Sequence, residues 1–127
     1  MKWQVIIIAI VLYLTCGCRQ IQRPQLLLST YNYDFGVVDS AMVYSGSVTL
    51  LNCGSANLQI EQINTGCGCT SAQCTKNTIA PGETGVLRFT FDTKNKTGEQ
   101  SQFISIIANT DSLVHILKLT AFVENQI

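Results

Sequence analysis

The amino-acid sequence predicts an all-β domain, an antiparallel β-sandwich of about seven strands. Three observations lead to this fold class. Apolar and polar residues alternate with a period of two over most of the chain after residue 30, which is typical of strands with one face in a core. Turn residues recur about every ten positions. No stretch shows the period of about 3.6 residues that marks an amphipathic helix.

Each expected strand has an inward apolar face. In chain order the inward residues are Tyr31, Tyr33 and Phe35; Val48 and Leu50; Leu58 and Ile60; Leu87, Phe89 and Phe91; Ile104, Ile106 and Ala108; and Leu117, Leu119, Ala121 and Val123. Turns are expected at Gly36, at Asn52-Cys53-Gly54-Ser55 and at Pro81-Gly82-Glu83. No connection is long enough for a crossover helix, so strands should pair antiparallel. An immunoglobulin-like sandwich fits this pattern best, and a small barrel is the nearest alternative.

Length and charge limit the classes of function. A chain of 127 residues has room for one domain with one core. Eight basic residues balance eight acidic ones, so the chain has no strong field that would gather nucleic acid. We therefore expect no nucleic-acid partner.

The amino-terminal segment has the pattern of an export signal. Lys2 precedes an apolar run from Val5 to Leu14, and small residues and cysteines follow. A run of about ten apolar residues is half the length that a membrane-spanning helix needs. Residues 1–17 are therefore predicted to be a signal peptide, and the mature chain is expected in the cell envelope.

The cysteines that end this segment separate plain secretion from lipoprotein processing. Gly17 followed by Cys18 resembles the end of bacterial lipoprotein signals, where the cysteine becomes the acylated amino terminus. Cys16 is a second candidate, and both can also be ordinary cysteines of a discarded peptide. We expect a lipid anchor on Cys18 that holds a periplasmic or outer-membrane lipoprotein at the membrane.

The segment after the anchor reads as a tether, residues 18–30, before a domain at residues 31–124. The tether is polar and contains Pro24. Its three leucines at positions 26–28 have no strand pattern of their own and can lay an edge strand or an apolar patch onto the domain.

Catalytic groups are scarce. His115 is the single histidine, so any Ser-His or Cys-His pair has to use it, and it falls in the last expected strand. The chain has no G-x-S-x-G elbow, P-loop or H-E-x-x-H motif. The sequence predicts no catalytic residue and no cofactor.

Four cysteines of the mature domain, Cys53, Cys67, Cys69 and Cys74, are its unusual chemical feature. An oxidising exterior favours disulfides. Residues i and i+2 reach bonding distance only with strain, so we predict a Cys69–Cys74 bridge, a reactive Cys67 thiol and a Cys53 apart from the others. As an alternative, Cys67, Cys69 and Cys74 could hold Cu(I) or Zn²⁺. A redox-active pair is weaker, because C-x-x-C before a helix is the usual arrangement.

Five short motifs carry a resemblance to a known family. They are Tyr33-Asp34-Phe35-Gly36, Asn52-Cys53-Gly54, Cys67-Gly68-Cys69-Thr70, Ile79-Ala80-Pro81-Gly82-Glu83 and Asn109-Thr110-Asp111. With them the chain resembles the bacterial domain of unknown function fifteen seventy-three, a family similar to Hydin-type immunoglobulin-like modules of exported proteins. Cys53 and Cys74 depart from the family pattern. The resemblance covers nearly all of residues 31–124 and implies a fold and a compartment, but no established activity.

Two triplets resemble the Asp-Ser-aliphatic O-glycosylation sites of exported Bacteroidetes proteins. They place candidate sites at Ser40 and Ser112, both in expected turns, although three-residue motifs also occur by chance.

Two functional hypotheses remain. The first is a non-catalytic envelope module that offers sheet faces or edge strands to a protein partner. The second is a metal- or thiol-handling protein that uses the cysteine loop.

Overall fold

The computed structural model describes residues 3–7 and 22–124. Residues 3–7 are helical. In the part of the chain that is described, no helix has the length and apolar character needed to cross a bilayer. The lipidation candidates Cys16 and Cys18 lie outside the described residues, as does most of the expected signal peptide.

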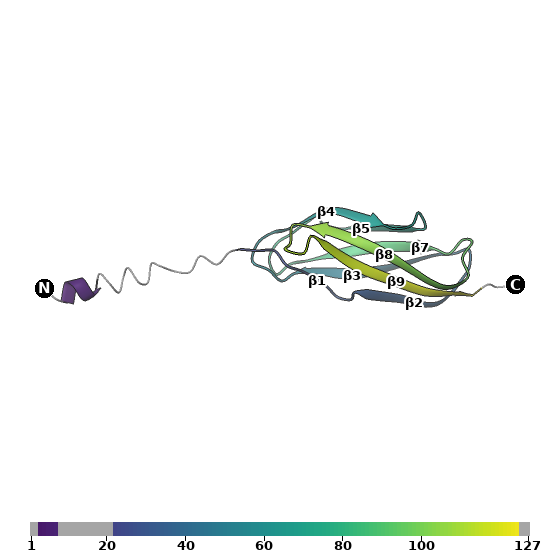
Figure 1. The fold of residues 1–127 in the computed structure, drawn as a ribbon, viewed down its shortest axis with the longest axis horizontal. Helices are drawn as coiled ribbons and strands as arrows, with labels where there is room; N and C mark the ends of the chain where they lie inside the picture. The colour runs from purple at the N-terminus through teal and green to yellow at the C-terminus, as the bar shows by residue number, and fades with distance from the viewer. Residues whose placement is uncertain (1–2, 8–21, 125–127) are drawn as a thin grey trace.

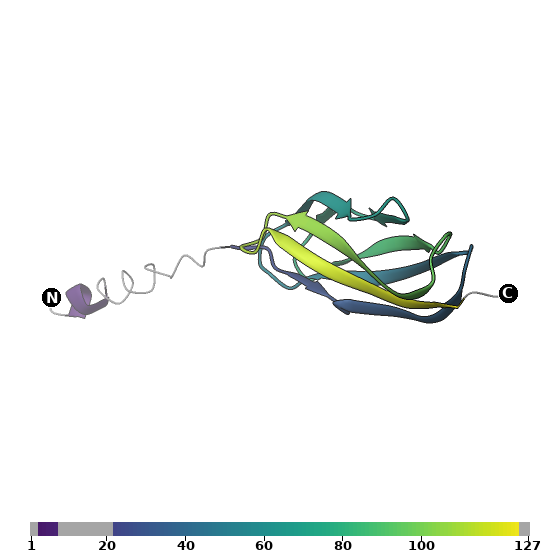
Figure 2. The ribbon, with the colours of Figure 1, turned by 45° about the vertical axis from the view of Figure 1, so that its right-hand side comes forward.

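Residues 22–124 fold into two β-sheets packed face to face (Figures 1 and 2). The strands are β1 (Leu26–Leu28), β2 (Asn32–Asp39), β3 (Val43–Asn52), β4 (Leu58–Thr65), β5 (Thr70–Cys74), β6 (Thr78–Ile79), β7 (Thr84–Asp92), β8 (Gly98–Ala108) and β9 (Val114–Glu124). One sheet has the order β1-β3-β7-β5, and the other has the order β2-β9-β8-β4-β6. The predicted all-β sandwich is confirmed.

One strand pair departs from the expected antiparallel arrangement. Strand β2 runs parallel to β9, with Asn32 beside Lys118 and Asp39 beside Glu124. The other strand pairs among the described residues are antiparallel. Parallel neighbours need a long connection, and here the connection is the remainder of the domain rather than a crossover helix.

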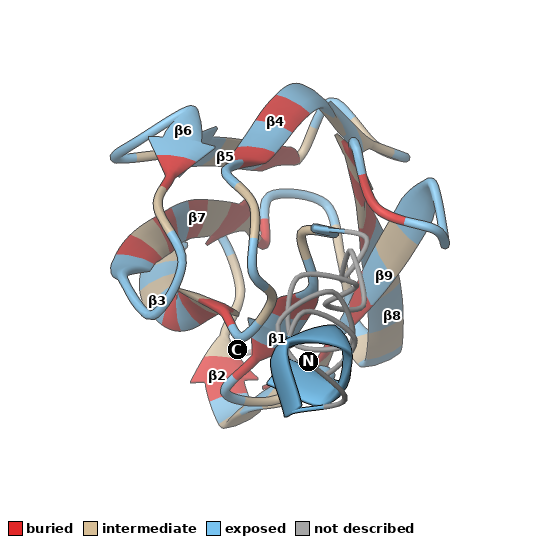
Figure 3. Ribbon diagram, turned by 90° about the vertical axis from the view of Figure 1, so that its left-hand side faces the viewer, coloured by how far each residue is buried: buried red, intermediate tan, exposed pale blue. Residues whose placement is uncertain are grey.

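The predicted inward faces are confirmed in five strands, β3, β4, β7, β8 and β9. Leu50, Leu58, Leu87, Ile104 and Leu117 have no exposed surface, and Figure 3 shows the alternation of buried and exposed residues along the strands. Alternate side chains of a strand point to opposite faces, so the apolar set of each sheet fills the space between the two layers.

Strand β2 is the exception to the expected register. Gly36 does not form a turn: it has a φ of 75° inside the strand, and the pairing with β9 shifts between Asp34 and Val37. This bulge makes Val38 the buried residue while Val37 is 66% exposed. Tyr31, expected inside, is 47% exposed and lies before the strand begins.

Aromatic side chains join the two sheets where a glycine leaves room. The ring centroid of Tyr33 lies 5.0 Å from that of Phe89, with the planes at 81°, an edge-to-face geometry that aromatic pairs favour. A Cβ atom on Gly46 would lie 2.7 Å from the ring of Tyr33 and 2.8 Å from that of Phe89. Gly46 is therefore required for this contact.

Asn52, at the end of β3, is fully buried and connects three segments. Its side-chain Nδ2 donates to the carbonyls of Ala56 at 2.8 Å and Ile79 at 2.9 Å. Its Oδ1 accepts from the backbone N–H of Gln25 at 3.3 Å and Gly54 at 3.0 Å. All four hydrogen bonds that an amide side chain can readily make are thus formed inside the protein.

The chain that enters the domain passes close to Gly54, beside the Asn52 network. A Cβ on Gly54 would lie 2.2 Å from the carbonyl oxygen of Arg23, so only glycine lets the incoming chain pass. Strand β1 then pairs with the end of β3, Leu26 beside Asn52, and Leu26 and Leu28 are buried. The expected tether, residues 18–30, therefore gives its three leucines to the sandwich as an edge strand.

We predict that Asn52→Asp destabilises the domain by about 2–4 kcal/mol. The aspartate keeps both acceptors but turns an oxygen toward the carbonyls of Ala56 and Ile79, which lose their donor. Chemical denaturation measures the free energy of unfolding. The control is Asn57→Asp, which introduces the same charge at an exposed position of the same turn and should change stability little. Equal effects of the two variants would contradict the role given to Asn52.

Candidate functional site

The cysteine loop connects β4 of one sheet to β5 of the other, and it contains a disulfide. Cys67 and Cys69 are bonded, with an S–S distance of 2.08 Å and a Cα–Cα distance of 5.1 Å. The backbone N–H of Thr70 donates to the carbonyl of Cys67 at 3.2 Å, which closes a turn over these residues. Cys69 also packs against the smaller core cluster around Phe91.

The predicted Cys69–Cys74 bridge is wrong in this structure. The segment expected to be a short loop is strand β5, and an extended strand of five residues is about 16 Å long, beyond the reach of any disulfide. The i, i+2 pairing that we expected to be difficult forms because the turn folds the chain back on itself. Cys67 is consequently bonded and is not the reactive thiol that we expected.

Cys53 and Cys74 are free. Cys53 is exposed in the turn after β3, where its backbone N–H donates to the carbonyl of Gln25 at 3.0 Å. Cys74 is half-buried at the end of β5, and burial raises the pKa of its thiol, against backbone hydrogen bonds with Lys76 and Thr75 that lower it. A raised pKa keeps the thiol protonated and slow to react.

The alternative metal site requires three sulfur ligands in one place. Two of the three candidate sulfurs are joined to each other, and Cys74 lies at the other end of β5. Within the described ranges no three side chains of histidine, cysteine, aspartate or glutamate lie close enough to hold a metal ion. The geometry therefore does not favour this donor set.

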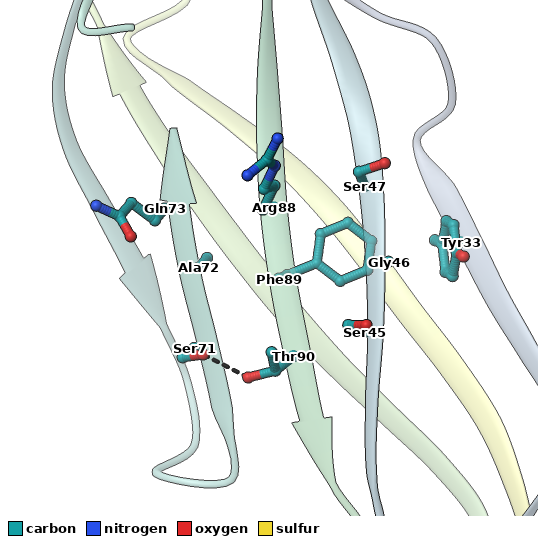
Figure 4. Close-up of a pocket in the computed structure, with 10 residues that line it drawn as sticks. All are labelled: Tyr33, Ser45, Gly46, Ser47, Ser71, Ala72, Gln73, Arg88, Phe89 and Thr90. Carbon is teal, nitrogen blue, oxygen red and sulfur yellow. Dashed lines mark hydrogen bonds between the residues drawn. The ribbon is translucent and has the colours of Figure 1, made fainter. Parts of the chain in front are cut away.

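A depression of about 780 Å³ lies on the outer face of the four-stranded sheet (Figure 4). The polar residues that line it are Ser45 and Ser47 from β3, Arg88 and Thr90 from β7, and Ser71 and Gln73 from β5. The hydroxyls of Ser71 and Thr90 hydrogen-bond to each other. Its lining contains one charged group and neither a histidine nor a carboxylate, so it offers hydrogen bonds rather than a nucleophile and a base.

The edge of this sheet beside the depression is formed by β5. Within residues 22–124 strand β5 pairs only with β7, and a groove of about 260 Å³ runs between it and β4. Its lining is mainly polar. Ile60, Ile63, Ala72 and Cys74 are its apolar residues, Glu61 adds a carboxylate, and its other polar residues are Gln62, Gln73 and Asn77. Residues 70–74 are not among the strands expected from the sequence, so this edge was not predicted. The signal was present in Thr70, Ala72 and Cys74, which alternate with the more polar Ser71 and Gln73.

The remaining candidate residues lie at the two ends of the domain. Nε2 of His115 is 2.8 Å from the hydroxyl of Thr110. Since that hydroxyl donates to the carbonyl of Ser112, it accepts the hydrogen of Nε2. Burial lowers the pKa of His115, and a backbone hydrogen bond with Ser112 opposes the change. Ser112 is exposed in this turn, whereas Ser40 is half-buried in the turn between β2 and β3.

We predict a fixed order of thiol reactivity in the unreduced protein. Iodoacetamide should modify Cys53 several-fold faster than Cys74, because Cys53 is exposed and burial keeps Cys74 protonated. Cys67 and Cys69 should react only after reduction. Mass spectrometry of peptides over a time course measures all four positions. Rapid labelling of Cys67 without reductant, or of Cys74 before Cys53, would contradict this arrangement.

Comparison with solved structures places the fold among known β-sandwiches. A protein of unknown function from Porphyromonas gingivalis W83 has a TM-score of 0.70 and 21% identity, over 80% of this chain and 47% of that one. The ASH / PapD-like domain 7 of human CEP192 has a TM-score of 0.62 and 10% identity, over 87% of this chain and 93% of that one. The Vibrio cholerae VesB protease has a TM-score of 0.61 and 14% identity, over 80% of this chain and 32% of that one.

These likenesses concern the fold alone, and the chain spans about half the length of the Porphyromonas protein. A search of curated proteins finds no match. The sequence does match a family model over residues 26–123, from the first residue of β1 to the residue before the end of β9. This match includes the Asn52 network, the cysteine loop and both sheets, and the chain therefore belongs to the family described as protein of unknown function DUF1573.

Proposed function

We propose that the chain is an exported, lipid-anchored β-sandwich module without catalytic activity, which binds an extended segment of a partner protein in the cell envelope. The open edge of β5 carries the proposal. A sheet edge offers unpaired backbone groups, and natural proteins usually protect such edges with shortness, charge, proline or a bulge. Strand β5 has none of these protections.

The other sheet edges differ from β5. Strands β1 and β6 have three and two residues. Strand β2 is broken by the bulge at Gly36 and carries Asp34, whose carboxylate accepts from the N–H of Gly36 at 2.8 Å. Strand β1 covers only the last residues of β3. Along the part of β3 that β1 does not cover, the ring of Tyr33 packs beside Gly46. Strand β5 is regular over five residues and has no charge and no proline.

The register of β5 identifies the groups that a partner strand would meet. Asp92 N–H donates to the carbonyl of Cys69, and Thr75 N–H donates to the carbonyl of Val86. Hydrogen-bonded pairs alternate along an antiparallel ladder, so Ser71 and Gln73 bond to β7. The backbone groups of Ala72 and Cys74 therefore point toward the open edge.

The groove beside this edge defines the chemistry of the partner. An added strand would place one side chain beside Ile63 and Ala72, which favours an apolar residue at that position, while Gln62, Gln73 and Asn77 favour polar residues elsewhere in the groove. Glu61 lines the same groove and has no ion-pair partner within residues 22–124. A basic residue in the partner segment would complement it.

Lipid anchoring is tested by labelling. We expect cells given labelled fatty acid to incorporate it into the chain, and Cys18→Ala to abolish the incorporation while Cys16→Ala leaves it unchanged. If Cys16→Ala alone abolished it, the modified cysteine would lie two residues earlier. Labelling that survives both changes, or no labelling of the unchanged chain, would remove the lipoprotein part of the proposal.

Strand binding is tested with a displayed library of seven-residue peptides and the purified full chain. We expect selected peptides to alternate apolar with polar residues and to include a lysine or arginine. Ala72→Pro should reduce their affinity about tenfold or more, because it removes an edge-facing N–H and blocks the ladder. The fold should survive, since that N–H takes no part in pairing with β7.

Ala72→Ser is the matched control, because it keeps the N–H and nearly the same volume. It should bind the selected peptides like the unchanged chain. Glu61→Gln should weaken only the peptides that carry a basic residue. Selected peptides that bind Ala72→Pro and Ala72→Ser equally well would show that the β5 edge is not their site.

A further inference from the structure

The chain enters the domain at a fixed point on one end of its long axis (Figure 1). The backbone of Arg23 exchanges hydrogen bonds with Ser55: the N–H of Arg23 donates to Oγ of Ser55 at 3.2 Å, and the N–H of Ser55 donates to the carbonyl of Arg23 at 2.8 Å. The guanidinium of Arg23 also pairs with Asp111 at 2.9 Å. Arg23 is therefore part of the folded domain, and we call this end the tether end.

The length of chain between this point and the proposed lipid anchor is short. Arg23 is five positions after Cys18, and a fully extended chain over that separation spans at most about 18 Å. Strand β3, which runs along the domain for ten residues, is about 33 Å long. An acylated Cys18 would thus hold the tether end closer to the bilayer than the length of the domain itself.

Exposed apolar side chains surround the entry point. Leu113 is 63% exposed in the turn between β8 and β9, two residues after Asp111, and Val114 beside it is 50% exposed. Leu27 of β1 is 46% exposed, and it lines a hollow of about 360 Å³ together with residues of the same turn. Exposure alone does not select this end, because Met42 and Val43 at the far end are equally exposed. The short tether to Cys18 is what would bring this end, and not the far end, to the bilayer.

We infer that the tether end of the domain rests on the lipid bilayer, with Leu113, Val114 and Leu27 entering the boundary between headgroups and acyl chains. The inference rests on the lipid anchor of the proposed function. A short linker holds the two surfaces at a high effective concentration, so three apolar side chains suffice although they would not bind a membrane alone. The one ion pair that the described residues form at this end, Arg23 with Asp111, is neutral overall, and the contact is apolar rather than electrostatic.

Tryptophan fluorescence on vesicles tests this contact. Trp3 is the only tryptophan of the chain and belongs to the segment expected to be removed, so the processed chain has no tryptophan emission of its own. The probes are Leu113→Trp and Leu27→Trp at the tether end and Val43→Trp at the far end, each in the processed, acylated chain on phosphatidylcholine vesicles with brominated acyl chains. Unfolding midpoints equal to that of the unchanged chain establish that each variant is folded.

We expect Leu113→Trp to lose about half of its emission and to shift to the blue, Leu27→Trp to change in the same direction, and Val43→Trp to change in neither respect. Raising the salt concentration should leave the quenching unchanged. Acylated protein that floats with the vesicles while all three reporters remain unquenched would overturn the inference and leave the anchor standing. Equal quenching of the two ends would also overturn it. Protein that does not float would overturn the anchor and the inference together.

Discussion

The side-chain amide of Asn52 joins segments that are far apart in the sequence, and much of the fold depends on it. It holds the incoming chain at Gln25, the turn at Gly54 and Ala56, and the end of β6 at Ile79. The backbone of Asn52 adds two more bonds, donating to the carbonyl of Glu83 and accepting from Gly82 N–H. Because a buried polar group left unpaired is costly, these segments can only move together. The same network fixes the point at which the tether enters.

Whereas the Asn52 network holds segments together, the connection from β4 to β5 leaves two strand edges uncovered. After β4 the chain turns through the Cys67–Cys69 loop and starts β5 in the other sheet. Among the described residues, no strand beyond Thr78 and Ile79 of β6 pairs with β4 on this side, and none pairs with the outer edge of β5, so two sheet edges face one groove. The disulfide lies within the turn and joins neither strand to the other, and the groove lies between β4 and β5.

The two proposals assign different parts of the surface to different contacts. The tether end would face the bilayer, and the β5 edge runs along the side of the domain, where it would stay free for a partner in the aqueous space. The polar depression on the outer face of the same sheet adjoins that edge through Ser71 and Gln73. Proteins of similar fold do not assign a partner, because their identities of 10–21% show the architecture alone.

The sequence by itself determined the all-β class and the inward face of most strands, because side-chain direction alternates strictly along a strand and a buried face must be apolar. It also marked Asn52 and Gly54 through a motif, without showing their purpose. Tertiary structure alone decided the parallel pairing of β2 with β9, the bulge at Gly36 and the Cys67–Cys69 bond. It also decided that β5 is an open edge. The strand pairing, the bulge and the open edge depend on which distant segments become neighbours, and local alternation of residues carries no information about a distant neighbour. The Cys67–Cys69 bond is local, but it depends on how the turn folds, which the spacing of the two cysteines does not reveal.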